Sequence, residues 1–145
     1  MKATSGSLEE TKEIAESILR DLERGDRATV LALVGDLGAG KTAFSQAVGE
    51  TLGVEDPMQS PTFVIEKIYP IDARGFKHLI HIDAYRLDHE HELVSLGWQE
   101  IIADPDNIIL IEWPERVKGI MPEDAKKISF EFVDETTRTI CYEEN

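Results

Sequence analysis

The sequence predicts an α/β fold, a three-layer sandwich whose central sheet is parallel in the middle and carries antiparallel additions. An apolar run at 30–34 leads through glycines into a helical pattern, and two further apolar runs, at 79–82 and 108–111, enclose another helical pattern. Near the end, the segment 128–142 alternates apolar and polar residues around a turn. Continuous apolar runs are typical of buried parallel strands, whereas alternation is typical of antiparallel strands with one exposed face.

The first element is expected to be a helix over 8–24. Ser7-x-x-Glu10 is a capping box, apolar residues then recur on one face, and Gly25 is placed to close the helix. The other elements are expected in this order: a strand at 30–34, a helix ending at Gly53, a strand at 64–69, a hairpin turn at 72–75, a strand at 79–82, a helix at 92–102, a strand at 108–111, and two strands within 128–142 joined by a hairpin at 134–137.

The length favours one domain over residues 1–145, with a single core. Cys141 is the only cysteine, so an internal disulfide is impossible and a reducing compartment is expected. The first ten residues lack the apolar segment of a signal peptide, and no apolar run approaches the length of a membrane span. We therefore expect a cytoplasmic protein that does not enter a membrane.

The strongest single signal is a glycine-rich loop directly after the first apolar run. It matches the pattern G-x-x-x-x-G-K-[ST] at every fixed position, as Gly35-Asp36-Leu37-Gly38-Ala39-Gly40-Lys41-Thr42. Such a phosphate loop, or P-loop, turns its N–H groups toward β- and γ-phosphate oxygens, while the lysine adds charge and the hydroxyl can bind Mg²⁺. The strand before it and the helix after it complete the context, since a helix N-terminus attracts anions. The sequence therefore predicts a P-loop NTPase-like fold that binds a nucleotide.

Two carboxylates are placed to complete an active site around the phosphates. Asp83 and Glu112 each follow an apolar run. In an open α/β sheet the ligand lies beyond the carboxyl ends of the strands, so both could face the phosphates, although either could instead be a solvated acid. Together with Lys41 they are the candidate catalytic residues, because hydrolysis needs a metal contact and a group that positions water.

Several other side chains near these carboxylates have two interpretations each. Trp113 points to the side of the strand opposite Glu112, and its spacing alone favours a place in the core over stacking on a base. Ser60-Pro61-Thr62 is either a loop that senses the γ-phosphate or an ordinary proline turn. Arg86 and Arg116 either neutralise transition-state charge or pair with an acid. The candidates for sensing the γ-phosphate are Ser60, Thr62 and Arg86.

Three histidines, His81, His89 and His91, lie among acidic residues. This pattern hints at zinc, but no fourth ligand is evident, so a solvated loop is the favoured interpretation. The net charge is −14, from 15 basic and 29 acidic residues, which opposes direct binding to a polynucleotide. The acidic residues either keep the protein soluble or face a protein partner with a basic surface.

Four segments together resemble the bacterial TsaE (YjeE) family, the small ATPases of tRNA threonylcarbamoyladenosine biosynthesis. They are the P-loop, Ser60-Pro61-Thr62-Phe63, His81-x-Asp83-x-Tyr85-Arg86-Leu87 and Ile111-Glu112-Trp113. The resemblance implies ATP or ADP with Mg²⁺ as cofactors and a complex with TsaB- and TsaD-type proteins, which are sugar-kinase-like paralogues. In that complex, slow ATP hydrolysis would be stimulated and would support repeated threonylcarbamoyl transfer to an adenosine beside the tRNA anticodon. The protein would reach tRNA only through the complex.

The resemblance also assigns roles to individual residues. It implies that Thr42 and Glu112 bind Mg²⁺, that Asp83 assists hydrolysis, and that Trp113 stacks on adenine with Thr11 in the same pocket.

Ala43 departs from the family pattern, because it replaces the second hydroxyl residue that usually follows Thr42. This removes one candidate contact to the α-phosphate.

Three other functions compete with an ATPase. A small-molecule kinase would need an arginine-bearing lid, for which the chain has no insertion, and a GTP switch normally carries an N-K-x-D motif, which does not occur. A nucleotide-gated binding module would share every motif with a slow ATPase.

Overall fold

The computed structural model describes residues 1–36, 38–55 and 65–143 and shows a seven-stranded sheet in the order β1-β7-β6-β2-β5-β4-β3. Its strands are β1 (Lys2–Ser5), β2 (Thr29–Val34), β3 (Glu66–Ala73), β4 (Phe76–Asp83), β5 (Asn107–Glu112), β6 (Lys126–Phe132) and β7 (Arg138–Glu143). The four central strands β6, β2, β5 and β4 run parallel, while β7 and β1 extend one edge and β3 the other in antiparallel pairing. The predicted fold class is confirmed.

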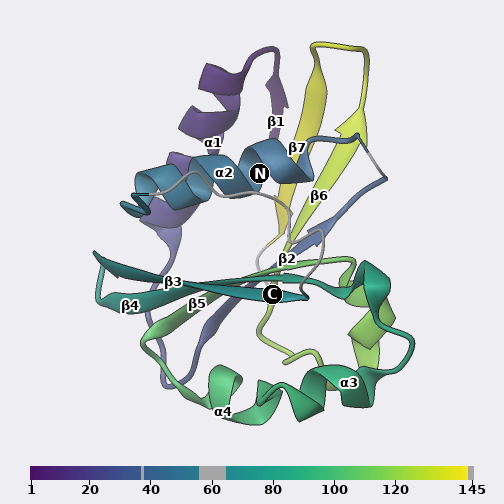
Figure 1. Cartoon of the computed structure of the whole chain (residues 1–145). Helices are drawn as coiled ribbons and strands as arrows, with labels where there is room; N and C mark the ends of the chain where they lie inside the picture. The colour runs from purple at the N-terminus through teal and green to yellow at the C-terminus, as the bar shows by residue number, and fades with distance from the viewer. Residues whose placement is uncertain (37, 56–64, 144–145) are drawn as a thin grey trace.

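Helices cover both faces of this sheet (Figure 1). The helices are α1 (Leu8–Asp21), α2 (Lys41–Thr51), α3 (Glu90–Ser95) and α4 (Trp98–Ala103), with 3-10 helices η1 (Ala84–Arg86) and η2 (Pro114–Ile120). Alternation along β2 divides the core: Leu31 and Leu33 pack with α1 and α2, and Val30 and Ala32 pack with α3 and α4. Within the described residues, no helix has both the length and the apolar character needed to cross a membrane.

The first helix begins as predicted but ends earlier. The Ser7 Oγ accepts a hydrogen bond from the Glu10 N–H at 3.1 Å, which satisfies one of the first-turn donors. The helix stops at Asp21 instead of continuing to residue 24. Leu22 has an extended backbone and is buried, so the chain leaves the helix at the point where this side chain enters the core.

The strand β1 was not predicted from the sequence. The strand has only four residues, most of them polar, so its sequence shows no clear alternation of apolar and polar residues. The strand forms because it pairs with β7, with Lys2 opposite Cys141 and Ser5 opposite Arg138. This pairing satisfies backbone groups at the edge of β7 that would otherwise be open.

The prediction of one helix over 92–102 was wrong, because α3 and α4 are separate. Gly97 lies between them with φ of 88°, a left-handed conformation that glycine adopts without steric cost. The resulting turn places Trp98 in the core, 1% exposed, where its Nε1 donates to the Ile120 carbonyl at 3.0 Å.

The strand predicted at 64–69 is longer than expected and runs to Ala73. Pro70 is tolerated because β3 is an edge strand, where a missing N–H breaks no central ladder. The predicted turn at 72–75 is confirmed: Arg74 and Gly75 have φ of 55° and 87°, as a two-residue hairpin turn requires. Residue 64 and the segment Ser60-Pro61-Thr62-Phe63 lie outside the described residues.

Candidate nucleotide-binding site

The glycine-rich loop joins β2 to α2 and is shaped by three glycines. Gly38 and Gly40 have φ of 80° and 106°, and Gly40 is the N-cap of α2. A Cβ at Gly35 would lie 2.8 Å from the Phe130 carbonyl oxygen, so a side chain there would collide with β6. Asp36 is exposed and Ala39 is buried, while Leu37 lies outside the described residues. The loop therefore curls at the start of α2, where the first-turn N–H groups have no intrahelical partners.

Lys41 is the first residue of α2 and is unusually buried for a lysine, at 5% exposure. Its Nζ has no hydrogen-bond partner among the described residues and lies 3.6 Å from the centre of the Trp113 ring. Burial lowers the pKa of Lys41 below its ordinary value, and nearby carboxylates, Glu112 foremost, oppose this shift. An ammonium group without hydrogen-bond partners keeps three N–H donors, from which phosphate oxygens could accept hydrogen bonds.

Glu112 ends β5 and is 5% exposed. Its Oε2 lies 2.6 Å from the Nε2 of His81, which is itself 1% exposed on the neighbouring strand β4. Asp83 pairs in register with Glu112, so both predicted carboxylates stand at the same end of two adjacent parallel strands. Asp83 is only half-buried, and its Oδ1 accepts a hydrogen bond from the Tyr85 N–H at 3.0 Å.

Trp113 has a strained backbone immediately after Glu112. Its φ and ψ of 59° and 51° are left-handed, which costs a bulky residue roughly 1–2 kcal/mol and persists only where the surroundings fix it. The indole ring contacts the Lys41 ammonium on one side and Tyr85 at a centroid distance of 5.0 Å. This places Trp113 beside the lysine of the P-loop, and its predicted stacking on adenine remains a prediction.

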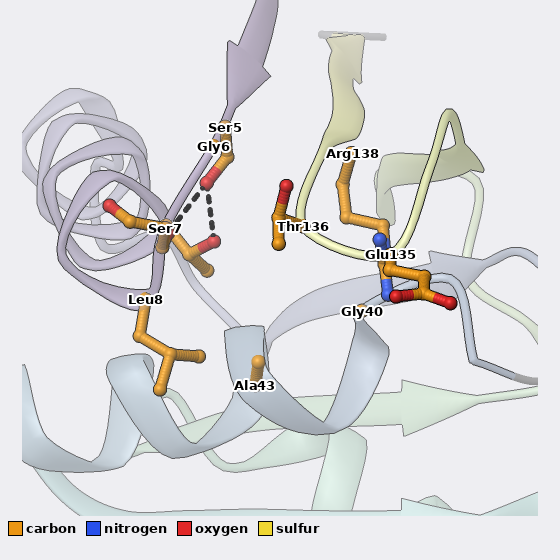
Figure 2. Close-up of a pocket in the computed structure, with 10 residues that line it drawn as sticks. Ser5, Gly6, Ser7, Leu8, Gly40, Ala43, Glu135, Thr136 and Arg138 are labelled. Carbon is orange, nitrogen blue, oxygen red and sulfur yellow. Dashed lines mark hydrogen bonds between the residues drawn. The ribbon is translucent and has the colours of Figure 1, made fainter.

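A cavity of about 280 Å³ opens beside the P-loop (Figure 2). One wall comes from β1 and the start of α1, the floor from α2, and the other wall from the connection between β6 and β7. Its lining residues are Ser5, Gly6, Ser7, Leu8, Thr11, Gly40, Ala43, Glu135, Thr136 and Arg138.

The cavity brings together three residues that the sequence analysis had placed near the nucleotide, Thr11, Gly40 and Ala43. Thr11 is buried, and its Oγ1 shares a hydrogen bond of 2.7 Å with the Ser5 Oγ. Trp113 is not among the lining residues, so Thr11 and Trp113 do not share this cavity.

Sequence reasoning assigned Arg138 no role, and its favoured interpretation of His81 as part of a solvated loop was wrong, because His81 is 1% exposed on strand β4. The Arg138 Nε donates to the Gly38 carbonyl at 3.1 Å and so links β7 to the P-loop across 100 positions of sequence. No local pattern signals such a contact. His81 precedes Asp83 by two positions and therefore shares its face of β4, a signal that was available in the sequence.

The remaining predicted residues surround this centre or lie outside the described residues. Arg86 is exposed on η1, and the Arg116 guanidinium lies 5.1 Å from the centre of the Tyr85 ring. His89 and His91 are exposed around the start of α3. Ser60 and Thr62 belong to the segment outside the described residues.

The residues predicted to hold Mg²⁺ offer suitable atoms. Glu112 uses Oε2 for His81, which leaves Oε1 for a cation, and Thr42 is exposed on the first turn of α2. Within the described ranges, no three His, Cys, Asp or Glu side chains form a group that could hold a metal ion. A Mg²⁺ ion needs no such group, because it usually combines one or two carboxylates with substrate phosphates and water.

Comparison with known proteins identifies the family. The sequence model of the threonylcarbamoyl adenosine biosynthesis protein TsaE matches residues 5–140. The chain belongs to the TsaE family. The matched range includes the P-loop, both carboxylates and every residue that lines the cavity.

Relatives of the TsaE family support this assignment along nearly the whole chain. The tRNA threonylcarbamoyladenosine biosynthesis protein TsaE of Bacillus subtilis is 36% identical, covering 92% of this chain and 79% of the relative. The protein of the same name from Treponema pallidum is 33% identical, covering 97% and 98%. Among solved structures, the crystal structure of Bacillus subtilis YdiB matches with a TM-score of 0.73 and 30% identity, covering 98% of this chain and 83% of that one.

Proposed function

We propose that this TsaE-family protein is a P-loop ATPase that acts in tRNA threonylcarbamoyladenosine biosynthesis. It hydrolyses ATP within a complex of TsaB- and TsaD-type partners and so allows repeated rounds of modification. One observation carries the proposal: the buried ammonium of Lys41, in the P-loop, lacks a hydrogen-bond partner within the described residues. It interacts electrostatically with the nearby carboxylates Glu112 and Asp83. A group that is costly to bury in this way is characteristic of a functional site.

The phosphates of ATP would bind at the curled loop. First-turn N–H groups of α2 supply donors, and Lys41 would leave the indole face of Trp113 to reach the β- and γ-phosphate oxygens. Exchanging a weak cation–π contact for charge-assisted hydrogen bonds favours the bound arrangement.

Thr42 and Glu112 would hold Mg²⁺, which when bound neutralises charge that develops on the phosphates. Asp83, in register with Glu112 on the next strand, would orient the attacking water. The cavity between β1, α2 and β7 would take the nucleoside, since it opens beside Gly40 and Ala43 at the start of α2.

The family and the net charge support the proposal that this protein acts with protein partners. The names of the relatives place those proteins in the biosynthesis of tRNA threonylcarbamoyladenosine. A net charge of −14 opposes contact with tRNA, so a partner would have to bridge the two.

The direct test is ATP turnover by the purified chain, alone and with TsaB- and TsaD-type proteins. Slow hydrolysis alone and clear stimulation in the complex are expected, because a charge supplied by a partner can raise such rates by about 10³–10⁵. Asp83→Ala and Glu112→Ala should each suppress the stimulated rate and stop repeated tRNA modification before they stop a single round. Normal multi-round modification by folded Glu112→Ala would refute the role of hydrolysis.

A nucleotide-gated binding module is the second candidate, and one observation favours it. Asp83 already caps η1 through the Tyr85 N–H, so its carboxylate has a structural use without catalysis. Asp83→Asn keeps a side-chain oxygen that can accept this bond. If the complex modifies tRNA repeatedly without measurable ATP turnover, and does so equally with Asp83→Asn, nucleotide binding alone is the working signal and Asp83 only caps the turn.

A further inference from the structure

We infer that His81 is a positioning residue, which holds the Glu112 carboxylate in the orientation that binds Mg²⁺. The inference rests on the proposed function and deepens it. Metal binding would depend on His81, although His81 is not one of the residues predicted to bind the metal or the nucleotide. The contact that carries it is the 2.6 Å pair between His81 Nε2 and Glu112 Oε2.

Both members of the pair are removed from solvent, at 1% and 5% exposure. A buried carboxylate is costly unless hydrogen bonds compensate for the lost water. The Lys41 ammonium also interacts electrostatically with Glu112, but it lies over the Trp113 ring. The direct side-chain contact that fixes Glu112 therefore comes from His81.

Strand register explains how the pair forms. His81 is opposite Leu110 on β5, two positions before Glu112, so the two side chains are diagonal neighbours on one face of the sheet. The contact uses Oε2 and fixes the plane of the carboxylate, so that Oε1 is the oxygen available to a cation. Partners of this kind orient metal ligands in many proteins, and losing one typically costs metal affinity.

The geometry also fixes which ring nitrogen takes part. His81 Nδ1 is buried without a hydrogen-bond partner among the described residues. The ring contacts Glu112 through Nε2, and because an ionised carboxylate can only accept hydrogen bonds, a replacement must place a donor at the same reach. Glutamine carries its amide nitrogen at this distance from the backbone, whereas asparagine is too short and leucine has no donor.

The test measures how Mg²⁺ tightens binding of a non-hydrolysable ATP analogue in wild type, His81→Leu, His81→Asn and His81→Gln. The Mg²⁺ concentration needed for half-maximal tightening should rise about 10–100-fold in the Leu and Asn variants and stay within about threefold in the Gln variant. Binding of the analogue in EDTA should be the same in all four proteins. His78→Leu is the matched control, because His78 is exposed on the same strand, and it should behave as wild type.

An unchanged Mg²⁺ requirement in His81→Asn, or equal losses in the Gln and Asn variants, would overturn the role of His81. The Asn and Gln comparison decides the question even if His81→Leu does not fold. If Mg²⁺ fails to tighten analogue binding by the wild type, the proposed function itself fails. If Mg²⁺ tightens analogue binding by the wild type but the His81 variants need the same Mg²⁺ concentration, only the positioning role is overturned.

Discussion

Lys41 combines two properties that oppose each other at the scale of a single residue. Its ammonium is 5% exposed and lacks a hydrogen bond within the described residues, which costs folding free energy. The same isolation leaves its charge available for phosphate. A residue that is useful for binding is therefore expected to reduce the stability of the nucleotide-free protein.

Replacing Lys41 with Met should abolish most nucleotide binding and stabilise the nucleotide-free protein. Removing a poorly compensated buried charge should contribute roughly 1 kcal/mol and raise the melting temperature by about 2–5 °C at neutral pH. The pKa of Lys41 is lowered in the folded state, so the cost is present below that pKa and disappears as pH rises through it. The advantage of Lys41→Met over wild type should therefore shrink at alkaline pH.

Lys12→Met is the control for this prediction, because Lys12 is on the surface in an ion pair with Glu50 at 2.9 Å. It should leave nucleotide binding unchanged and should not stabilise the protein. A Lys41→Met protein that melts below wild type at neutral pH would mean that the contact with Trp113 outweighs the cost of burial.

Trp113 gives a second prediction, in which two roles lead to opposite results. If the indole holds Lys41, Trp113→Ala frees the ammonium and should tighten inorganic tripolyphosphate by about two- to fivefold, the equivalent of 0.5–1 kcal/mol. If the indole stacks on adenine, the variant should weaken ATP about fivefold or more and leave tripolyphosphate unchanged. We expect the first result, and calorimetric titration with both ligands distinguishes the two.

At the scale of elements, the break between α3 and α4 depends on one residue. Gly97 has φ of 88°, which costs another residue about 1–2 kcal/mol. Gly97→Ala should therefore lower the melting temperature by several degrees, while nucleotide affinity is retained because the break is on the far side of the sheet from the P-loop helix.

Gly25→Ala is the matched control for the Gly97 variant. A Cβ at Gly25 would meet no atom within 4 Å, and the residue follows the end of α1. It should be neutral or slightly stabilising. Equal melting temperatures for Gly97→Ala and wild type would show that another feature determines the break.

The sequence predicted the elements whose signals are local. The apolar run of β2 and the glycines after it define the strand and loop, and the carboxylates Asp83 and Glu112 were correctly placed at strand ends. Features that depend on distant pairing were missed. β1 forms only against β7, and the diagonal contact of His81 with Glu112 requires the register of β4 on β5.

The predicted role of Trp113 shows the same limit. Alternation along a strand assigned its side chain to one face, but β5 ends at Glu112 and the left-handed backbone at Trp113 turns the ring toward Lys41. Periodicity describes a strand only as far as the strand continues.

At the scale of the whole molecule, the charge of −14 gives a prediction about tRNA. The isolated protein should not bind tRNA in a gel-shift titration at moderate salt, because a strongly acidic surface repels a polyanion. Adding TsaB- and TsaD-type partners should produce a retarded species that contains this protein. Micromolar binding by the protein alone would reveal a local basic patch that outweighs the overall field.

The arrangement of the cavity also constrains when, during synthesis, this part of the protein can form. One wall comes from residues 5–8 and the other from residues 135–138, so the ribosome makes the first wall long before the second. Strand β1, which precedes the first wall, stays unpaired until β7 has left the ribosome and β1 can pair with it. The proposed nucleoside cavity can therefore form only after both walls have been made, and a nucleotide held there would stabilise the folded protein rather than an early folding intermediate.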